Sequence, residues 1–218
     1  MKKIAISQRV EVVNAYQETR DCLDQNWTSL LEELGMIAIP IPNTLKDPVV
    51  WLKAMQVDGV ILSGGNDLSF LPNAKNASPS RDRTERVLLD YLSTTDIPVL
   101  GVCRGMQMLC HYFGGQLIEV ANHAATEHMI KLVEASNDLH QAGYQTLETV
   151  NSFHNWGIAL DGLHDALTPM ALDQQGHIEA LKHNAKPWWG IMWHPERDGN
   201  SLTKDKNLVK HIFKSERV

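Results

Sequence analysis

The sequence predicts an α/β fold with a mostly parallel central sheet, helices on both of its faces and antiparallel additions in the C-terminal half. Two observations indicate this class. In the first half of the chain, short apolar runs alternate with segments of helical periodicity. Such alternation implies right-handed βαβ crossovers, which place parallel strands side by side and cover both sheet faces. From about Gln116 onward, short extended runs follow one another, which favours antiparallel or mixed strands.

The elements of the first half are short and separated by turn residues. Strands are predicted at residues 4–6, 36–41, 59–62 and 97–102. Helices are predicted at residues 21–34, 48–56, 81–92 and 104–113. Ligands of such sheets bind at the carboxyl ends of the strands, so the residues that follow each strand are the first candidates for a site.

The second half is predicted to be mainly extended. The candidate strands are residues 117–120, 129–134, 146–153, 168–171, 177–183 and 188–193. Gln174–Gly176 is expected to form a hairpin turn, and a helix over residues 208–213 to close the chain. The tryptophans at 188, 189 and 193 are expected to pack in the core, and a stacking platform for a nucleobase is the alternative.

Composition restricts the class of protein. The chain has 218 residues, 43% hydrophobic and 21% charged, which indicates one globular domain over residues 1–218. A net charge of −6 argues against binding to nucleic acid or to a membrane surface. Three cysteines without a CxxC pair, and no signal-like or membrane-spanning apolar run, indicate a cytoplasmic protein without disulfides.

The strongest motif is Gly101-Val102-Cys103-Arg104-Gly105, between an apolar strand and an apolar helix. This is the context of a nucleophile elbow. The turn is so tight that the second residue before the nucleophile and the second residue after it must be small, and both are glycine here. The turn places the Cys103 sulfur beside a helix N-terminus, which favours a thiolate. The alternative is a buried small hydrophobe, the usual role of a free cysteine and the one expected of Cys110.

A thiolate nucleophile needs a proton shuttle and a group that orients the shuttle. Among the ten histidines, only His194 ends a strongly apolar run and is followed two residues later by a carboxylate, that of Glu196. In extended chain these two side chains point to the same side, so Glu196 can bind one ring nitrogen while the other faces Cys103. Taken alone, His-Pro-Glu also suits a turn at the end of a strand.

These motifs together resemble the class I glutamine amidotransferase family. GVCRGMQ and WHPE carry the resemblance, SGGND is similar to the family's oxyanion loop, and VNSFHNWGI resembles the segment that lines its glutamyl pocket. The resemblance covers nearly the whole chain. The free-standing length and the Arg-Asp-x-x-Glu run at residues 81–85 are most similar to the branch of stand-alone γ-glutamyl hydrolases.

The resemblance implies a mechanism. Cys103 attacks the γ-carbonyl of a glutamyl amide, and backbone N–H groups of Gly65 and Arg104 hold the oxyanion. His194, oriented by Glu196, protonates the leaving nitrogen and then activates water against a γ-glutamyl thioester, releasing L-glutamate. No cofactor and no metal are implied. The side chains implied to grip the glutamyl α-amino and α-carboxylate groups are Gln107, Ser152, Phe153 and His154.

The leaving group is the open question. The segments SQRV, YQETRDCLDQNW and IPIPN resemble hydrolases that act on γ-glutamyl-CDP-amidate and yield cytidine diphosphoramidate for capsular polysaccharide modification. Arg9, Arg20 and Arg81 are then expected to bind the substrate, because guanidinium groups suit phosphate. Another γ-glutamyl conjugate, such as γ-glutamyl-GABA, and a glutaminase subunit of an amidotransferase are the alternatives. We expect a small-molecule substrate and a monomer or small homo-oligomer.

Other classes are less consistent with the motifs. A non-enzymatic regulator does not need the Cys–His–Glu set, and chaperone or glyoxalase-like α/β proteins do not need the His-Pro-Glu segment. Residues 73–80 are predicted to form a mobile loop. The spacings of five histidines match no compact metal-ligand set, so we expect them in loops or at the surface: His123, His128, His140, His154 and His164.

Overall fold

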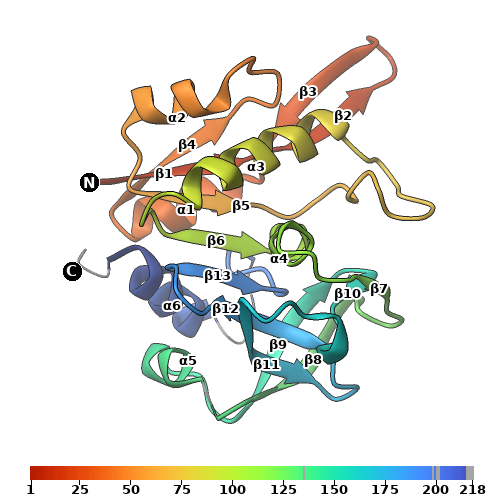
Figure 1. Cartoon of the computed structure of the whole chain (residues 1–218), viewed down its shortest axis with the longest axis vertical. Helices are drawn as coiled ribbons and strands as arrows, with labels where there is room; N and C mark the ends of the chain where they lie inside the picture. Colours follow the sequence, from red (N-terminus) through yellow and green to blue (C-terminus); the bar gives the residue numbers. More distant parts are fainter. Residues whose placement is uncertain (135, 198, 200–201, 215–218) are drawn as a thin grey trace.

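A nine-stranded sheet forms the centre of the molecule in the computed structural model, which describes residues 1–134, 136–197, 199 and 202–214 (Figure 1). Its parallel part has the strand order β4 (Met36–Ile41), β1 (Lys2–Ser7), β5 (Gly59–Leu62), β6 (Val99–Val102) and β13 (Trp188–Ile191). Its antiparallel part continues with β12 (Ile178–His183), β11 (Leu167–Asp173), β8 (Ala124–Leu132) and β9 (Leu147–Phe153). The predicted fold class is confirmed.

Helices cover both faces of this sheet. On one face, α1 (Gln25–Glu33), α5 (Asn137–Ala142) and α6 (Leu202–Lys214) contribute to one cluster of buried apolar side chains. On the other face, α2 (Pro48–Met55), α3 (Pro79–Leu92) and α4 (Arg104–Tyr112) contribute to a second cluster. None of the described helices is long and apolar enough to cross a bilayer.

A hairpin near the N-terminus was not expected from the sequence. Strands β2 (Arg9–Val13) and β3 (Glu18–Cys22) pair with each other outside the central sheet (Figure 1). The side chain of Asn66 accepts from the Val10 N–H and donates to the Val10 carbonyl, which ties the hairpin to the loop after β5. Helix α1 therefore begins four residues later than predicted, after the N-cap Asp24.

The second half follows the prediction with some additions. Strand β8 begins at Ala124 rather than at residue 129, because it pairs with β9 over its whole length. The hairpin turn before Ile178 is confirmed: Gly176 has φ +88°, and β11 pairs antiparallel with β12. Helix α5 was not predicted, nor were β10 (Trp156–Gly157) and the 3-10 turn Leu160–Gly162, whereas β7 (Ile118–Glu119) falls within the strand predicted at residues 117–120.

The three tryptophans near the end of the sheet are buried. Trp189 and Trp193 belong to the apolar cluster with α1 and α6, whereas Trp188 belongs to the cluster on the opposite face. Each is no more than 4% exposed, so none offers a free face to a nucleobase. Core packing is the role that the structure supports.

Candidate active site

Cys103 lies at a sharp turn between β6 and α4. Its backbone has φ +51° and ψ −105°, a conformation that is strained for a residue with a side chain. A Cβ on Gly105 would lie 2.0 Å from the Leu62 carbonyl oxygen, and one on Gly101 would lie 2.6 Å from the Gly105 backbone. Both flanking positions therefore require glycine, as the elbow interpretation predicts.

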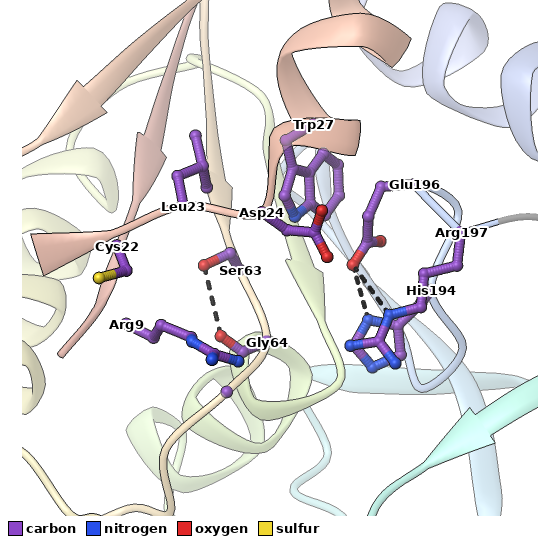
Figure 2. Close-up of a pocket in the computed structure, with 11 residues that line it drawn as sticks. Arg9, Cys22, Leu23, Asp24, Trp27, Ser63, Gly64, His194, Glu196 and Arg197 are labelled. Atoms are coloured by element: carbon purple, nitrogen blue, oxygen red, sulfur yellow. Dashed lines mark hydrogen bonds and ion pairs between the residues drawn. The ribbon is translucent and has the colours of Figure 1, made fainter. Parts of the chain in front are cut away.

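The imidazole of His194 follows β13 and contacts Glu196. Their Nδ1 and Oε1 atoms are 2.8 Å apart, and both side chains are buried (Figure 2). The Asn151 side chain accepts from the His194 N–H at 2.8 Å and donates to its carbonyl at 3.0 Å, which fixes the backbone that carries the ring.

Gly64 is the point at which Cys103 and His194 meet. A Cβ built on Gly64 would lie 2.8 Å from His194 Cε1 and 3.6 Å from Cys103 Cβ. The structure thus brings together the two side chains that the sequence places far apart along the chain. Only a residue without a side chain leaves room for both groups.

The electrostatic environment of His194 favours its protonated form. Burial by itself lowers the pKa of this imidazole, but the neighbouring Cys103 and Glu196 side chains overcome that effect and raise the pKa to about 9. At neutral pH the ring is therefore an imidazolium. The protonated ring is the form that can donate a proton to a leaving group.

This shift predicts a pH dependence of stability. The folded-state pKa of His194 is about 9 and its unfolded value about 6.5, so folding binds an extra proton between these pH values. This proton contributes roughly 3 kcal/mol to the free energy of unfolding. The contribution is complete below about pH 6.5 and is lost as the pH rises through about 9. Urea unfolding at a series of pH values measures it. The His194→Asn variant should lack this component; an unchanged pH profile in the variant contradicts the assignment.

The loop after β5 is oriented by Arg81. Its Nη1 donates to the carbonyl oxygens of Gly64, at 3.0 Å, and Gly65, and its Nη2 donates to that of Ser63 at 2.6 Å. With these carbonyls directed at Arg81, the Gly65 N–H is left without a backbone acceptor among the described residues, and so is the N–H of Arg104 at the start of α4. Both predicted oxyanion donors are thus available.

Arg81 itself does not occupy the predicted place. It is fully buried, so the structure corrects its expected role in substrate binding. Its Nε donates to Glu85 at 2.9 Å, and the Arg104 guanidinium bonds to Glu85 and Asp82.

Burial and the Arg104 charge lower the pKa of Arg81 to about 10, against the effect of Glu85. Burial disfavours ionised Glu85, yet Arg104 and Arg81 hold its pKa below the ordinary value. Arg81 is a positioning residue for the loop.

A cavity of about 210 Å³ opens beside Cys103 and contains most of the predicted glutamyl contacts. Gln107, Phe153 and His154 line it, and Gln107 Nε2 donates to the Trp156 carbonyl at 2.9 Å. Ser152 is different, because its buried hydroxyl donates to the carbonyl of His123 and is directed away from the cavity. The predicted loop over residues 73–80 contributes Lys75 and Asn76 to the wall; its motion stays a prediction.

His154 is neutral. Burial, together with the nearby His123 and His128 rings, lowers its pKa to about 3. Its Nδ1 donates to the Trp156 carbonyl at 3.1 Å. His154 therefore offers no positive charge to a substrate carboxylate, and its part in the cavity wall is one of shape and hydrogen bonding.

A second, smaller pocket is lined by Gly64 and His194 and shares Gly65 with the cavity beside Cys103 (Figure 2). Arg9 lines it, half-exposed and paired with Glu11 at 2.7 Å. Arg197 also lines it, with its guanidinium 4.0 Å from the centroid of the Phe153 ring. Sequence reasoning missed Arg197, although it follows the His-Pro-Glu motif directly. Arg20 lies farther along the hairpin, where it bonds to Glu18 at 2.8 Å, and it lines neither pocket.

Sequence comparisons find relatives over almost the whole chain. The family model described as Peptidase C26 matches residues 4–196. A γ-glutamyl-CDP-amidate hydrolase from Campylobacter jejuni is 34% identical over 198 residues, which cover 89% of this chain and 90% of that protein. A glutamine-hydrolysing GMP synthase subunit from Methanosarcina mazei is 29% identical over 205 residues, covering 94% and 95%.

Solved structures share the fold at low sequence identity. A glutamine amidotransferase from Thermotoga maritima has a TM-score of 0.73 at 13% identity and covers 98% of this chain and 99% of its own. The glutaminase domain of Trypanosoma brucei CTPS, with bound acivicin, has a TM-score of 0.72 at 12% identity and covers 100% and 96%. The arrangement of strands and helices described above is therefore one that other proteins also adopt.

Proposed function

Because the chain belongs to the peptidase C26 family, which is of class I glutamine amidotransferase type, we propose that this γ-glutamyl hydrolase acts on γ-glutamyl-CDP-amidate. The observation that carries the proposal is the meeting of Cys103 and His194 at Gly64, where Cys103 lines one cavity and His194 lines a neighbouring pocket that also contains two arginines. The 34% identity to a relative with this named activity supports the choice of substrate.

In the first step the Cys103 thiolate attacks the γ-carbonyl carbon of the substrate. The carbonyl oxygen takes the negative charge and accepts from the N–H groups of Gly65 and Arg104, and one such donor is commonly worth about 2.7–4 kcal/mol. His194, protonated at neutral pH, donates its proton to the leaving nitrogen as the C–N bond breaks. A γ-glutamyl thioester on Cys103 remains.

In the second step water replaces the amine. The now neutral His194 accepts a proton from a water molecule, which attacks the thioester carbonyl through its oxygen. The C–S bond breaks, L-glutamate leaves, and the thiolate and the imidazolium are restored. Glu196 holds the ring through both steps by its 2.8 Å contact with Nδ1, so that the other nitrogen exchanges protons with the substrate.

The leaving group would extend past Gly64 into the smaller pocket. Arg9 and Arg197 both line it, and guanidinium groups bind phosphate oxygens through paired hydrogen bonds. A phosphoramidate nitrogen is a weaker base than an alkylamine, which eases its departure. The product, cytidine diphosphoramidate, would serve capsular polysaccharide modification. We propose that residues 1–218 act as one catalytic domain in the cytoplasm, as a monomer or small homo-oligomer.

A glutaminase subunit is the second candidate. Its support is the relative from Methanosarcina mazei, a GMP synthase subunit that this chain matches over 94% of its length. Such a subunit takes free glutamine and releases ammonia, so the leaving group has no phosphate. The two arginines that line the smaller pocket favour the nucleotide conjugate instead.

Glutamate release from three substrates distinguishes these functions: γ-glutamyl-CDP-amidate, γ-glutamyl-GABA and L-glutamine. We expect kcat/KM to be highest for the CDP conjugate, because only that substrate engages the arginines. The Arg9→Gln variant should lower kcat/KM for this substrate about tenfold or more, the effect of losing a charged hydrogen bond, and leave the other two unchanged. Arg20→Gln is the matched control on the same hairpin. Equal rates on all three substrates would contradict the proposed specificity.

A further inference from the structure

A second cluster of ionisable side chains lies next to the glutamyl cavity, and the proposed reaction does not use it. His154 belongs to both, because it lines the cavity and its ring lies 5.0 Å from that of His123. The sheet brings the cluster together from separate segments around β8, β9, β11 and β12. Its members are His123, His128, His154, Asp173, His177 and Glu179.

The spacing within this cluster suits a metal ion. The ligand atoms of His123, His128 and Glu179 all lie within 4.8 Å of one another. The two oxygens of Glu179 lie 3.2 Å from His128 Nε2 and 3.6 Å from His154 Nε2. Ligands of one tetrahedral zinc ion, at bond lengths of about 2.1 Å, are about 3.4 Å apart. The two contacts of Glu179 with His128 and His154 are therefore already close to the distance between two ligands of one ion.

One pair of atoms in the cluster, His154 Nε2 and Glu179 Oε1, lacks a donor between them among the described residues. His154 Nδ1 donates to the Trp156 carbonyl at 3.1 Å, so the other ring nitrogen, Nε2, faces Glu179 Oε1 at 3.6 Å as an acceptor. Both side chains are 1% exposed, and within the described part of the chain neither atom has a hydrogen-bond partner. Two buried acceptors that face each other without a donor are costly. A cation between them removes this cost.

We propose that His123, His128 and Glu179 bind a divalent transition-metal ion, with zinc preferred and His154 completing a tetrahedral set. Imidazole nitrogens with one carboxylate oxygen are ligands typical of zinc, whereas magnesium and calcium favour oxygen ligands throughout. A proton on Glu179 is the competing occupant, since burial raises the pKa of this carboxyl group. His123 also contacts a second possible set, formed with Asp173 and His177.

The ion would stabilise structure and take no part in the acyl transfer. It would join β8, through His128, to β12, through Glu179, and hold the segment after β9 that carries His154. These positions do not include the nucleophile or its base, so this proposal stands or falls independently of the proposed function.

Metal analysis of the full-length protein, purified without a histidine tag, tests the site. After dialysis against micromolar zinc and then metal-free buffer, we expect about one equivalent of zinc by mass spectrometry of the elements. Removal by a chelator should lower the melting temperature by about 5 °C or more. Cobalt substitution should give the visible absorption of a tetrahedral site. A protein that retains no zinc, with an unchanged melting temperature, overturns the proposal.

Variants locate the ion. Glu179→Gln and His128→Asn should each lose the bound zinc, while His164→Asn, which changes a histidine outside the cluster, should keep it. Circular dichroism checks that each variant is folded. If Glu179→Gln does not fold, zinc binding by His128→Asn, a variant at a partly exposed position, decides whether the proposed set holds the ion. Zinc that is lost in Asp173→Asn but kept in Glu179→Gln and His128→Asn overturns the assignment, because it places the ion at the other set.

Discussion

Cys103→Ala is expected to abolish glutamate release from every γ-glutamyl substrate, with kcat lowered at least about 10⁴-fold. The nucleophile of a catalytic triad contributes this much or more, because the remaining groups cannot form the covalent intermediate. Steady-state glutamate release measures the loss. The circular dichroism spectrum should not change, since the alanine side chain fits wherever the cysteine side chain does and keeps the same backbone constraint.

Cys110→Ala is the matched control for this variant. Cys110 lies in α4, the helix that begins directly after Cys103, and burial raises the pKa of its thiol to about 12, so it stays protonated and unreactive. Its replacement should leave the rate close to that of the parent protein. Mass spectrometry of the parent, quenched during turnover, should find a glutamyl adduct on the peptide that contains Cys103. Turnover that persists in Cys103→Ala would remove the nucleophile assignment.

Glu85→Gln should produce the largest loss of stability. Glu85 is fully buried between two guanidinium groups, those of Arg81 and Arg104. Removing its charge leaves the two buried cations with only the Asp82 carboxylate, which bonds to Arg104. Breaking a buried ion pair in this way typically costs about 3–5 kcal/mol. Activity should fall as well, because Arg81 holds the carbonyls of Gly64 and Gly65 in place.

Urea unfolding measures this effect against a control on another helix. Glu32→Gln makes the same chemical change at an exposed position of α1 and should alter the free energy of unfolding by less than about 0.5 kcal/mol. If Glu85→Gln is no more destabilising than this control, the buried network does not carry the stability assigned to it.

The residues proposed to react were chosen from local sequence patterns. The two glycines around Cys103 and the carboxylate two residues after His194 are short-range features, and each depends only on the geometry of a few consecutive residues. The main strands and helices were predicted for the same reason, since their apolar periodicity is local. The spacing of residues alone did not show that Cys103 and His194 lie close together. Their proximity follows from the pairing of β6 with β13.

Features that depend on the pairing of distant segments were missed. Arg81 was expected to bind the substrate, because nothing local shows that α3, which carries both Arg81 and Glu85, packs against Arg104 in the interior. The hairpin of β2 and β3 is polar and depends on the side chain of Asn66, far along the chain. The buried histidine cluster was set aside because its spacings are irregular, and only the order of the antiparallel strands brings those side chains together.

The backbone at Cys103 has an evolutionary consequence. A side chain held at φ +51° costs of order 1–3 kcal/mol, and glycine at this position would relieve that cost. Substitutions that increase the stability of the fold therefore favour replacing the cysteine at this one position. A lineage that keeps the cysteine has a less stable fold than one with glycine at this position. A lineage in which the reaction is no longer needed gains stability when the cysteine is replaced.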